Sequence, residues 1–178
     1  GDVISFQFPN WREGAVVDIA AAALGLVVNP IVPIYRDAEL RFILSDAESK
    51  LILIPDQHRS IDYVNMICRL RPELPCLKHV VTLRATAEYP DTTRYEQLID
   101  CDPADESSLP VIDPNSIKCR LYTSGTTGFP KAVLHSHNTL TRIIDNTSDH
   151  SGTNSTDVMM MPSPITHITG YSSGLNLP

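Results

Sequence analysis

The sequence predicts an α/β fold in which a largely parallel sheet is flanked by helices. Short apolar runs, typical of buried strands, alternate with longer segments whose apolar residues recur at helical spacing. The chain has 178 residues, of which 42% are hydrophobic and 20% charged, so it can bury a core and is too apolar to be disordered. Strands and helices that alternate along one chain favour parallel strands joined by helices.

Residues 1–83 are expected to form a first α/β region of strands and helices. The apolar runs predict strands at residues 3–8, 26–34, 51–54 and 79–83. The intervening helices are expected to end near Leu24, Asp46 and Leu70. Polar residues that can cap a helix precede them, namely Asn10, Asp37 and Ser60.

Particular residues fix the orientation of these helices. Gly25 is expected to end the first helix in a left-handed conformation. The second helix has an apolar stripe made of Leu40, Ile43, Leu44 and Ala47. In the third helix the residues expected to face the core are Ile61, Val64, Ile67 and Cys68.

Residues 84–115 are rich in Asp, Glu, Ser, Thr and Pro, and are expected to be a surface connection that is helical only at residues 95–99. Residues 116–178 form the third region, which should contain strands at residues 117–122 and 132–135. A helix capped by Ser136 or Asn138 should follow and end near Asn146, and residues 147–157 should be a second connection. A strand at residues 158–161 is expected next, and its methionines fill the core more readily than they form a ligand surface.

The loop between residues 122 and 131 concentrates groups that bind phosphate. Four Ser and Thr hydroxyls, two glycines and Lys131 lie in one short turn, which can present hydroxyls, backbone N–H groups and an ammonium to the same small volume. An ordinary mobile turn has a similar composition, but the repeated Thr-Ser-Gly and Thr-Thr-Gly and the stiff Pro130 favour a binding loop. A Walker A loop is disfavoured, because two residues separate Gly128 from Lys131 and Ala132 stands where Ser or Thr would bind magnesium.

Residues 122–133 resemble the phosphate-binding signature of adenylate-forming enzymes, which include acyl-CoA synthetases, aryl-CoA ligases, luciferases and nonribosomal-peptide adenylation domains. The family pattern is Tyr-Thr-Ser-Gly-Thr-Thr-Gly-x-Pro-Lys-Gly-Val, and the chain departs from it only at Ala132, where the family has Gly. The resemblance implies that the phosphates of ATP are held by Thr123, Ser124, Gly125, Thr126, Thr127, Gly128 and Lys131. Residues 1–53 are similar to the corresponding segment of acyl-CoA synthetases.

A second segment, residues 161–170, matches the Pro-x-x-His-x-x-Gly element of acyl-CoA and aryl-CoA ligases. A loop histidine taken alone is usually a solvated bystander. The resemblance implies that His167 lies near the bound carboxylate and adenylate and orients the acyl group. The sequence Thr-His-Ile-Thr-Gly is most similar to that of short- or medium-chain and alicyclic acyl-CoA ligases, such as cyclohexanecarboxylate-CoA ligases.

The resemblance implies a ligase reaction in which a small carboxylic acid is activated by ATP through an acyl-adenylate and then transferred to coenzyme A, with Mg²⁺ accompanying ATP. The later motifs of the family are absent, so the chain is expected to be a partial N-terminal domain that is inactive alone and exposes apolar surface prone to self-association. An aryl or nonribosomal-peptide adenylation domain remains an alternative. A truncated, non-catalytic nucleotide-binding module is another.

Composition bounds the partners and the compartment. The net charge is −7 with no basic cluster, which argues against nucleic acid and anionic membranes as partners. The longest apolar run, residues 19–28, is preceded by Asp18 and is shorter than the about 20 residues that span a bilayer. No signal peptide is visible, and the four cysteines are expected to be free thiols in the cytoplasm. His135 and His137 lack a third ligand, so structural roles are favoured and no metal site is expected.

Overall fold

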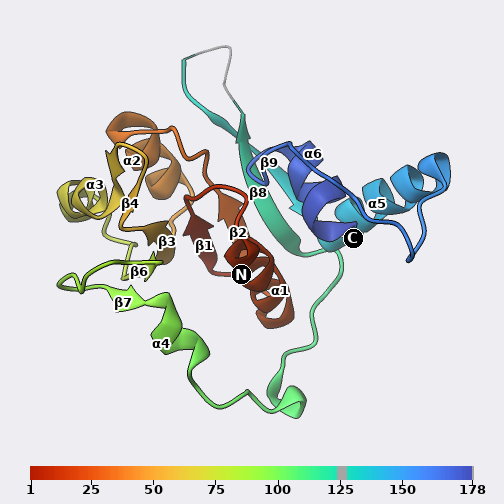
Figure 1. The fold of residues 1–178 in the computed structure, drawn as a ribbon, viewed down its shortest axis with the longest axis horizontal. Coiled ribbons are helices and arrows are strands. Elements are labelled where there is room, and N and C mark those ends of the chain that lie inside the picture. The colour runs from red at the N-terminus through yellow and green to blue at the C-terminus, as the bar shows by residue number, and fades with distance from the viewer. Residues whose placement is uncertain (124–127, 178) are drawn as a thin grey trace.

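The structure, a computed structural model, describes residues 1–123 and 128–177 and is built on a seven-stranded sheet (Figure 1). Neighbouring strands run parallel except for β8 and β9, which form an antiparallel hairpin at one edge. The prediction of a largely parallel α/β sheet is therefore confirmed. In spatial order the strands are β7 (Thr93–Arg94), β6 (His79–Leu83), β3 (Leu51–Pro55), β1 (Val3–Phe6), β2 (Val27–Pro30), β8 (Ile117–Thr123) and β9 (Lys131–Ser136).

The helices cover both faces of this sheet. They are α1 (Arg12–Leu24), α2 (Asp37–Asp46), α3 (Tyr63–Leu70), α4 (Tyr95–Ile99), α5 (His137–Ser151) and α6 (Ile168–Tyr171), and a π-helical turn, Ser172–Asn176, follows α6. Short 3-10 turns lie at Arg71–Glu73 and Glu106–Ser108, and a separate small hairpin pairs β4 (Gln57–His58) with β5 (Ile61–Asp62). None of the helices in the described residues is both long enough and apolar enough to cross a bilayer.

Two hydrophobic cores lie on opposite faces of the sheet, as the alternation within β3 shows. Ile52 and Ile54 belong to the core that α2 and α3 cover, whereas Leu53 between them belongs to the core that α1, α5 and α6 cover. The predicted stripe of α2 is confirmed, because all four of its residues are buried. Gly25 ends α1 with φ 67°, as predicted.

The direction of winding reverses at β1, which lies between β2 and β3. The chain moves from β1 to β2 on one side and then crosses to β3 on the other. Because such crossovers are right-handed, α1 falls on one face and α2 on the other. In open α/β sheets a crevice forms at the carboxyl ends of the strands where the winding reverses, so the segments that follow β1, β2 and β3 are where a ligand is expected.

Ser136 caps α5 as predicted, because its hydroxyl accepts from the Thr139 N–H, but the three caps predicted for the earlier helices are wrong. Helix α1 begins after Trp11 with no side-chain cap, and Asn10 bonds elsewhere. Helix α3 is capped by Asp62, whose carboxylate accepts from the Asn65 N–H at 2.9 Å, instead of by Ser60. Asp37 is the first residue of α2, and a bidentate pair with Arg69 holds the pKa of its carboxyl below the usual value.

Three further expectations are corrected. Cys68 is exposed, because it follows Ile67 around the helix and falls outside the apolar face of α3. Helix α5 continues to Ser151, through part of the expected connection. Residues 158–161 form no strand: Val158 is 98% exposed and Met160 86%, since no strand in the described part of the chain lies alongside to accept their hydrogen bonds.

Candidate functional site

The β8–β9 hairpin brings the two ends of the signature loop together. Thr123 pairs with Lys131 across the hairpin, and the Thr123 hydroxyl donates to the Lys131 carbonyl at 3.4 Å. Thr123, Gly128 and Lys131 are all exposed at the end of the hairpin, which projects beyond the sheet (Figure 1). Gly128 has φ 94°, a conformation that requires glycine. The other predicted phosphate ligands, Ser124, Gly125, Thr126 and Thr127, lie outside the described residues.

The end of β8 that leads into the loop is attached to α2 by a polar cluster that the sequence did not reveal. Asp46 of α2 accepts from the Tyr122 hydroxyl at 2.5 Å and from Arg120 at 2.7 Å. Burial and the carboxylate together raise the pKa of Tyr122 far above its usual value, so its hydroxyl remains a donor. Nearer the loop, the ring of Phe129 lies 5.4 Å from the ring of Phe42. Helix α2 therefore supports the hairpin at two levels.

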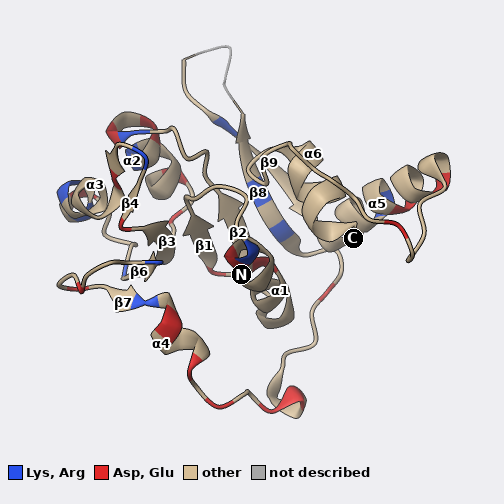
Figure 2. Cartoon of the chain, in the orientation of Figure 1, with Lys and Arg blue, Asp and Glu red and all other residues tan. Residues whose placement is uncertain are grey.

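Positive charge on this hairpin stands out against an acidic chain. Figure 2 shows basic bands on β8 and near the tip of the hairpin, whereas Asp and Glu follow the long segment between α4 and β8. Lys118, Arg120 and Lys131 all belong to the hairpin strands. Arg120 and Lys118 are engaged by carboxylates, so in the described residues Lys131 is the hairpin cation at the loop itself.

The second predicted element places His167 at the start of α6. The histidine is exposed, and its Nδ1 accepts from the Thr169 backbone N–H at 3.2 Å. An acceptor at Nδ1 puts the proton of the neutral ring on Nε2, which can then donate to an oxygen of a ligand. The predicted turn before a helix is thus confirmed, although the helix is only one turn long before the π-helical turn begins.

Asn10 holds the segment that leads into this histidine. Its side-chain amide donates to the Ser163 carbonyl at 2.9 Å, and its oxygen accepts from the Ile165 N–H at 2.9 Å. One side chain thereby satisfies a donor and an acceptor of a backbone segment 153 residues away. An asparagine before a helix is a natural cap, and nothing in the local sequence distinguishes this alternative use.

Asn10→Ala should lower the free energy of unfolding by about 1–2 kcal/mol, because it leaves two backbone groups without their partner. Urea unfolding measures the change. Asn65→Ala is the matched control, since the Asn65 amide bonds Asp62 only three residues away. Equal stability of the Asn10 variant and the unmodified protein would show that residues 163–165 are held by other contacts.

Gly170 permits the close approach that closes the His167 turn. A Cβ atom at this position would lie 2.1 Å from the Pro164 carbonyl oxygen and 2.6 Å from that of Ser163. The Pro164 oxygen already accepts from the His167 N–H at 3.0 Å, so it is fixed in place. The glycine of the Pro-x-x-His-x-x-Gly element is therefore needed for packing.

Gly170→Ala is expected to destabilise the protein by about 1–3 kcal/mol, because backbone atoms must move to admit the methyl group. Gly14→Ala provides the comparison: its Cβ would meet the end of the flexible Ile165 side chain at 2.7 Å, and alanine is the better helix former. Thermal unfolding of both variants measures the difference. A Gly170 variant at least as stable as the Gly14 variant would contradict the packing argument.

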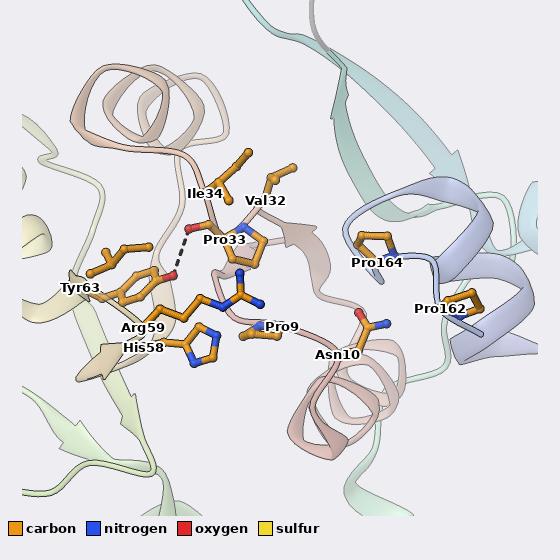
Figure 3. Close-up of a pocket in the computed structure, with 11 residues that line it drawn as sticks. Pro9, Asn10, Val32, Pro33, Ile34, His58, Arg59, Tyr63, Pro162 and Pro164 are labelled. Carbon is orange, nitrogen blue, oxygen red and sulfur yellow. Dashed lines mark hydrogen bonds between the residues drawn. The ribbon is translucent and has the colours of Figure 1, made fainter. Parts of the chain in front are cut away.

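A cavity of about 510 Å³ opens where the winding of the sheet reverses. Figure 3 shows its walls: Pro9 and Asn10 follow β1, Val32 to Ile34 follow β2, and Pro162 and Pro164 come from the His167 segment. His58 and Arg59, from the tight turn between β4 and β5, extend along its floor beside Tyr63. The walls are mostly apolar, and Arg59 supplies a positive charge. No motif in the sequence marks the residues that line this cavity.

The described residues contain no group of three or more His, Cys, Asp or Glu side chains arranged to hold a metal ion. His135 lies on β9 and His137 begins α5, and burial lowers the pKa of both rings, which favours their neutral forms.

Residues 1–178 match the model of a protein family described as AMP-binding enzyme. The chain belongs to this family. The chain is 32% identical over 183 residues to the medium-chain fatty-acid–CoA ligase of Escherichia coli strain K12. The matched region covers 100% of this chain and 31% of that relative. It is also 32% identical over 171 residues to the sulfoacetate–CoA ligase of Cupriavidus necator. That match covers 96% of this chain and 31% of the relative. This AMP-binding enzyme chain therefore spans about a third of the length of these relatives.

Solved structures agree with the fold. The acetoacetyl-CoA synthetase from Streptomyces lividans superimposes with a TM-score of 0.84 at 24% identity, covering 98% of this chain and 29% of that one. A protein from Rhodopseudomonas palustris described as a long-chain-fatty-acid CoA ligase superimposes with a TM-score of 0.82 at 20% identity. The match covers 99% of this chain and 42% of that one. At these identities the likeness shows that this chain shares the fold of the matching parts of the two proteins.

Proposed function

We propose that this AMP-binding enzyme, as part of a longer chain, activates a carboxylic acid with ATP and transfers the acyl group to coenzyme A. The observation on which the proposal depends most is the position of the signature loop. Its described residues stand at the free end of a hairpin, with Lys131 opposite Thr123 and exposed. Membership of the family and the CoA ligases among its relatives support the reaction class.

In the first step a carboxylate oxygen of the acid attacks the α-phosphorus of ATP. The bond from that phosphorus to the bridging oxygen breaks, pyrophosphate leaves, and an acyl-adenylate remains. The Lys131 ammonium and the loop hydroxyls and N–H groups would neutralise the charge that develops on the leaving pyrophosphate. Positioning and charge neutralisation account for most of such catalysis.

In the second step the thiolate of coenzyme A attacks the acyl carbon and AMP leaves. His167 would orient the acid, because its Nε2–H can donate to a carboxyl oxygen. The cavity beside the His167 segment suits coenzyme A: apolar walls match its pantetheine arm, and Arg59 matches a phosphate. Magnesium would accompany ATP.

The test is acid-dependent exchange of labelled pyrophosphate into ATP by the full-length protein, followed by thioester formation. Straight-chain, alicyclic, aryl and amino acids are compared in the same assay. Exchange that depends on an alkyl or alicyclic acid, with transfer to coenzyme A, supports the proposal. Exchange with aryl or amino acids and no coenzyme A thioester would instead favour the other adenylating classes. No exchange with any acid would favour a non-catalytic module.

A further inference from the structure

A buried ion pair joins α1 to β8 inside the core. The Lys118 ammonium lies 2.6 Å from a carboxylate oxygen of Asp18, and the two side chains are only 9% and 5% exposed. Charged side chains are almost never this deeply buried unless they are paired. Asp18 interrupts an apolar stretch of α1, and Lys118 lies on the strand that leads to the signature loop.

The pair extends into a network with the last helical segment of the chain. The Tyr171 hydroxyl donates to the second carboxylate oxygen of Asp18, and Lys118 also donates to the Asn176 side-chain oxygen at 2.5 Å. The Asn176 amide donates in turn to the Tyr171 carbonyl at 2.9 Å. Burial and the neighbouring carboxylate raise the pKa of Tyr171 strongly, so its hydroxyl stays protonated and remains a donor.

Stability alone is a weak reason for such a network. Desolvation of two charges offsets most of their attraction, and apolar residues of similar size would often fill the same space at no cost. What the network does provide is a fixed orientation, because hydrogen bonds to both carboxylate oxygens allow few alternative arrangements. Three elements distant in sequence, α1, β8 and the α6 segment, are thereby locked together.

His167 lies directly on this locked segment. It caps the N-terminus of α6, Tyr171 is the last residue of that helix, and the Tyr171 N–H donates to the His167 carbonyl at 2.8 Å. On the other side of the network, β8 continues from Lys118 to Thr123 at the mouth of the signature loop. A shift of Tyr171 must therefore move His167 relative to that loop.

We propose that the network of Asp18, Lys118, Tyr171 and Asn176 positions His167 relative to the signature loop. The bound acid and ATP are thereby held in the orientation that the reaction needs. The proposal rests on the proposed function, since it requires His167 to act on the acid. The residues of the network are positioning residues: they act through His167 and do not touch the substrate.

The test is a double-mutant cycle between Tyr171→Phe and His167→Ala in the full-length protein. Tyr171→Phe removes a hydroxyl that bonds a charged group, so kcat/KM for the acid should fall about tenfold while KM for ATP changes by less than about twofold. In the His167→Ala background the same change should cost less than about twofold, because the histidine is already gone. Tyr89→Phe is the matched control, since that hydroxyl also bonds an aspartate, Asp56, far from His167 in the sequence.

The outcomes separate the two proposals. If His167→Ala impairs exchange but Tyr171→Phe causes the same loss with and without His167, the positioning proposal is wrong and the proposed function stands. If His167→Ala leaves exchange intact, the role of His167 is wrong and the positioning role falls with it. A loss in Tyr89→Phe equal to that in Tyr171→Phe would also overturn positioning, because it would show a general structural effect.

Hydrogen exchange gives a readout that does not need activity. Amides of residues 163–171 in the full-length protein should exchange about tenfold faster in Tyr171→Phe than in the unmodified protein, because one bond that orders α6 is lost. The Tyr89→Phe variant should leave those amides unchanged. Unchanged exchange at residues 163–171 in Tyr171→Phe would overturn the proposal whatever the activity.

Discussion

Lys131→Ala is expected to lower acid-dependent pyrophosphate exchange by about a hundredfold or more, because it removes a charge aimed at the leaving pyrophosphate. Lys131 is suited to this role by its backbone. It follows Pro130, which restricts the preceding backbone. It also pairs with Thr123, and this pair is the one nearest the loop in the hairpin. The Lys131 residue is exposed at the loop, where a ligand can reach it.

The control for this prediction is Lys78→Ala. Lys78 is an exposed lysine whose ammonium bonds the nearby Pro75 carbonyl, so its loss removes one positive charge without touching the hairpin. The two variants have the same net charge, and only the Lys131 variant should lose exchange. Lys131→Arg should retain part of the activity, since it keeps the positive charge but replaces a compact ammonium with a planar guanidinium. Full activity in Lys131→Ala would remove this residue from the phosphate site.

Lys118→Met is expected to cost about 3–5 kcal/mol of the free energy of unfolding, the largest stability effect predicted for the described residues. The substitution leaves the Asp18 carboxylate without its cation, buried in the core that α1, α5 and α6 cover. Asp18→Leu should have a similar cost, because it leaves the ammonium uncompensated. Urea unfolding of the two single variants measures both.

Combining Asp18→Leu with Lys118→Met should recover most of that stability, since no buried charge then remains. The control is Arg41→Met, which breaks an ion pair with Glu73 whose side chains are 46% and 55% exposed and which should cost less than about 1 kcal/mol. A double variant as unstable as the sum of the two singles would contradict this account. The double variant should still fail to align His167, because Tyr171 and Asn176 have lost their partners.

The local patterns of the sequence predicted most of the sheet because most of its strands are short apolar runs between turns. The edge strand β7, Thr93–Arg94, is polar and lies in the segment that was expected to be a surface connection, so its sequence did not predict it. The bounds of β6 and α4 were predicted as the structure has them, and β3 differs by one residue. Residues 158–161 show the limit of this reasoning. A Val-Met run has the composition of a buried strand, but burial depends on a partner strand, and the run itself does not encode one.

The candidate site was predictable only where one continuous segment contains it. The signature loop and the His167 turn each lie within about ten residues, so their patterns are visible in the sequence. The contacts that hold them are not local: Asn10 meets Ser163 across 153 residues, and Asp18 meets Lys118 across 100. Asn10 also has the chemistry of a helix cap, and only the packed fold shows which partner it takes.

The most direct test of the central claim is a crystal structure of the full-length protein with a non-hydrolysable ATP analogue. We expect the β- and γ-phosphates to lie within hydrogen-bond distance of residues 123–131, with the Lys131 ammonium on one of their oxygens. Phosphates bound away from this hairpin, for example against Arg59 in the cavity, would contradict it.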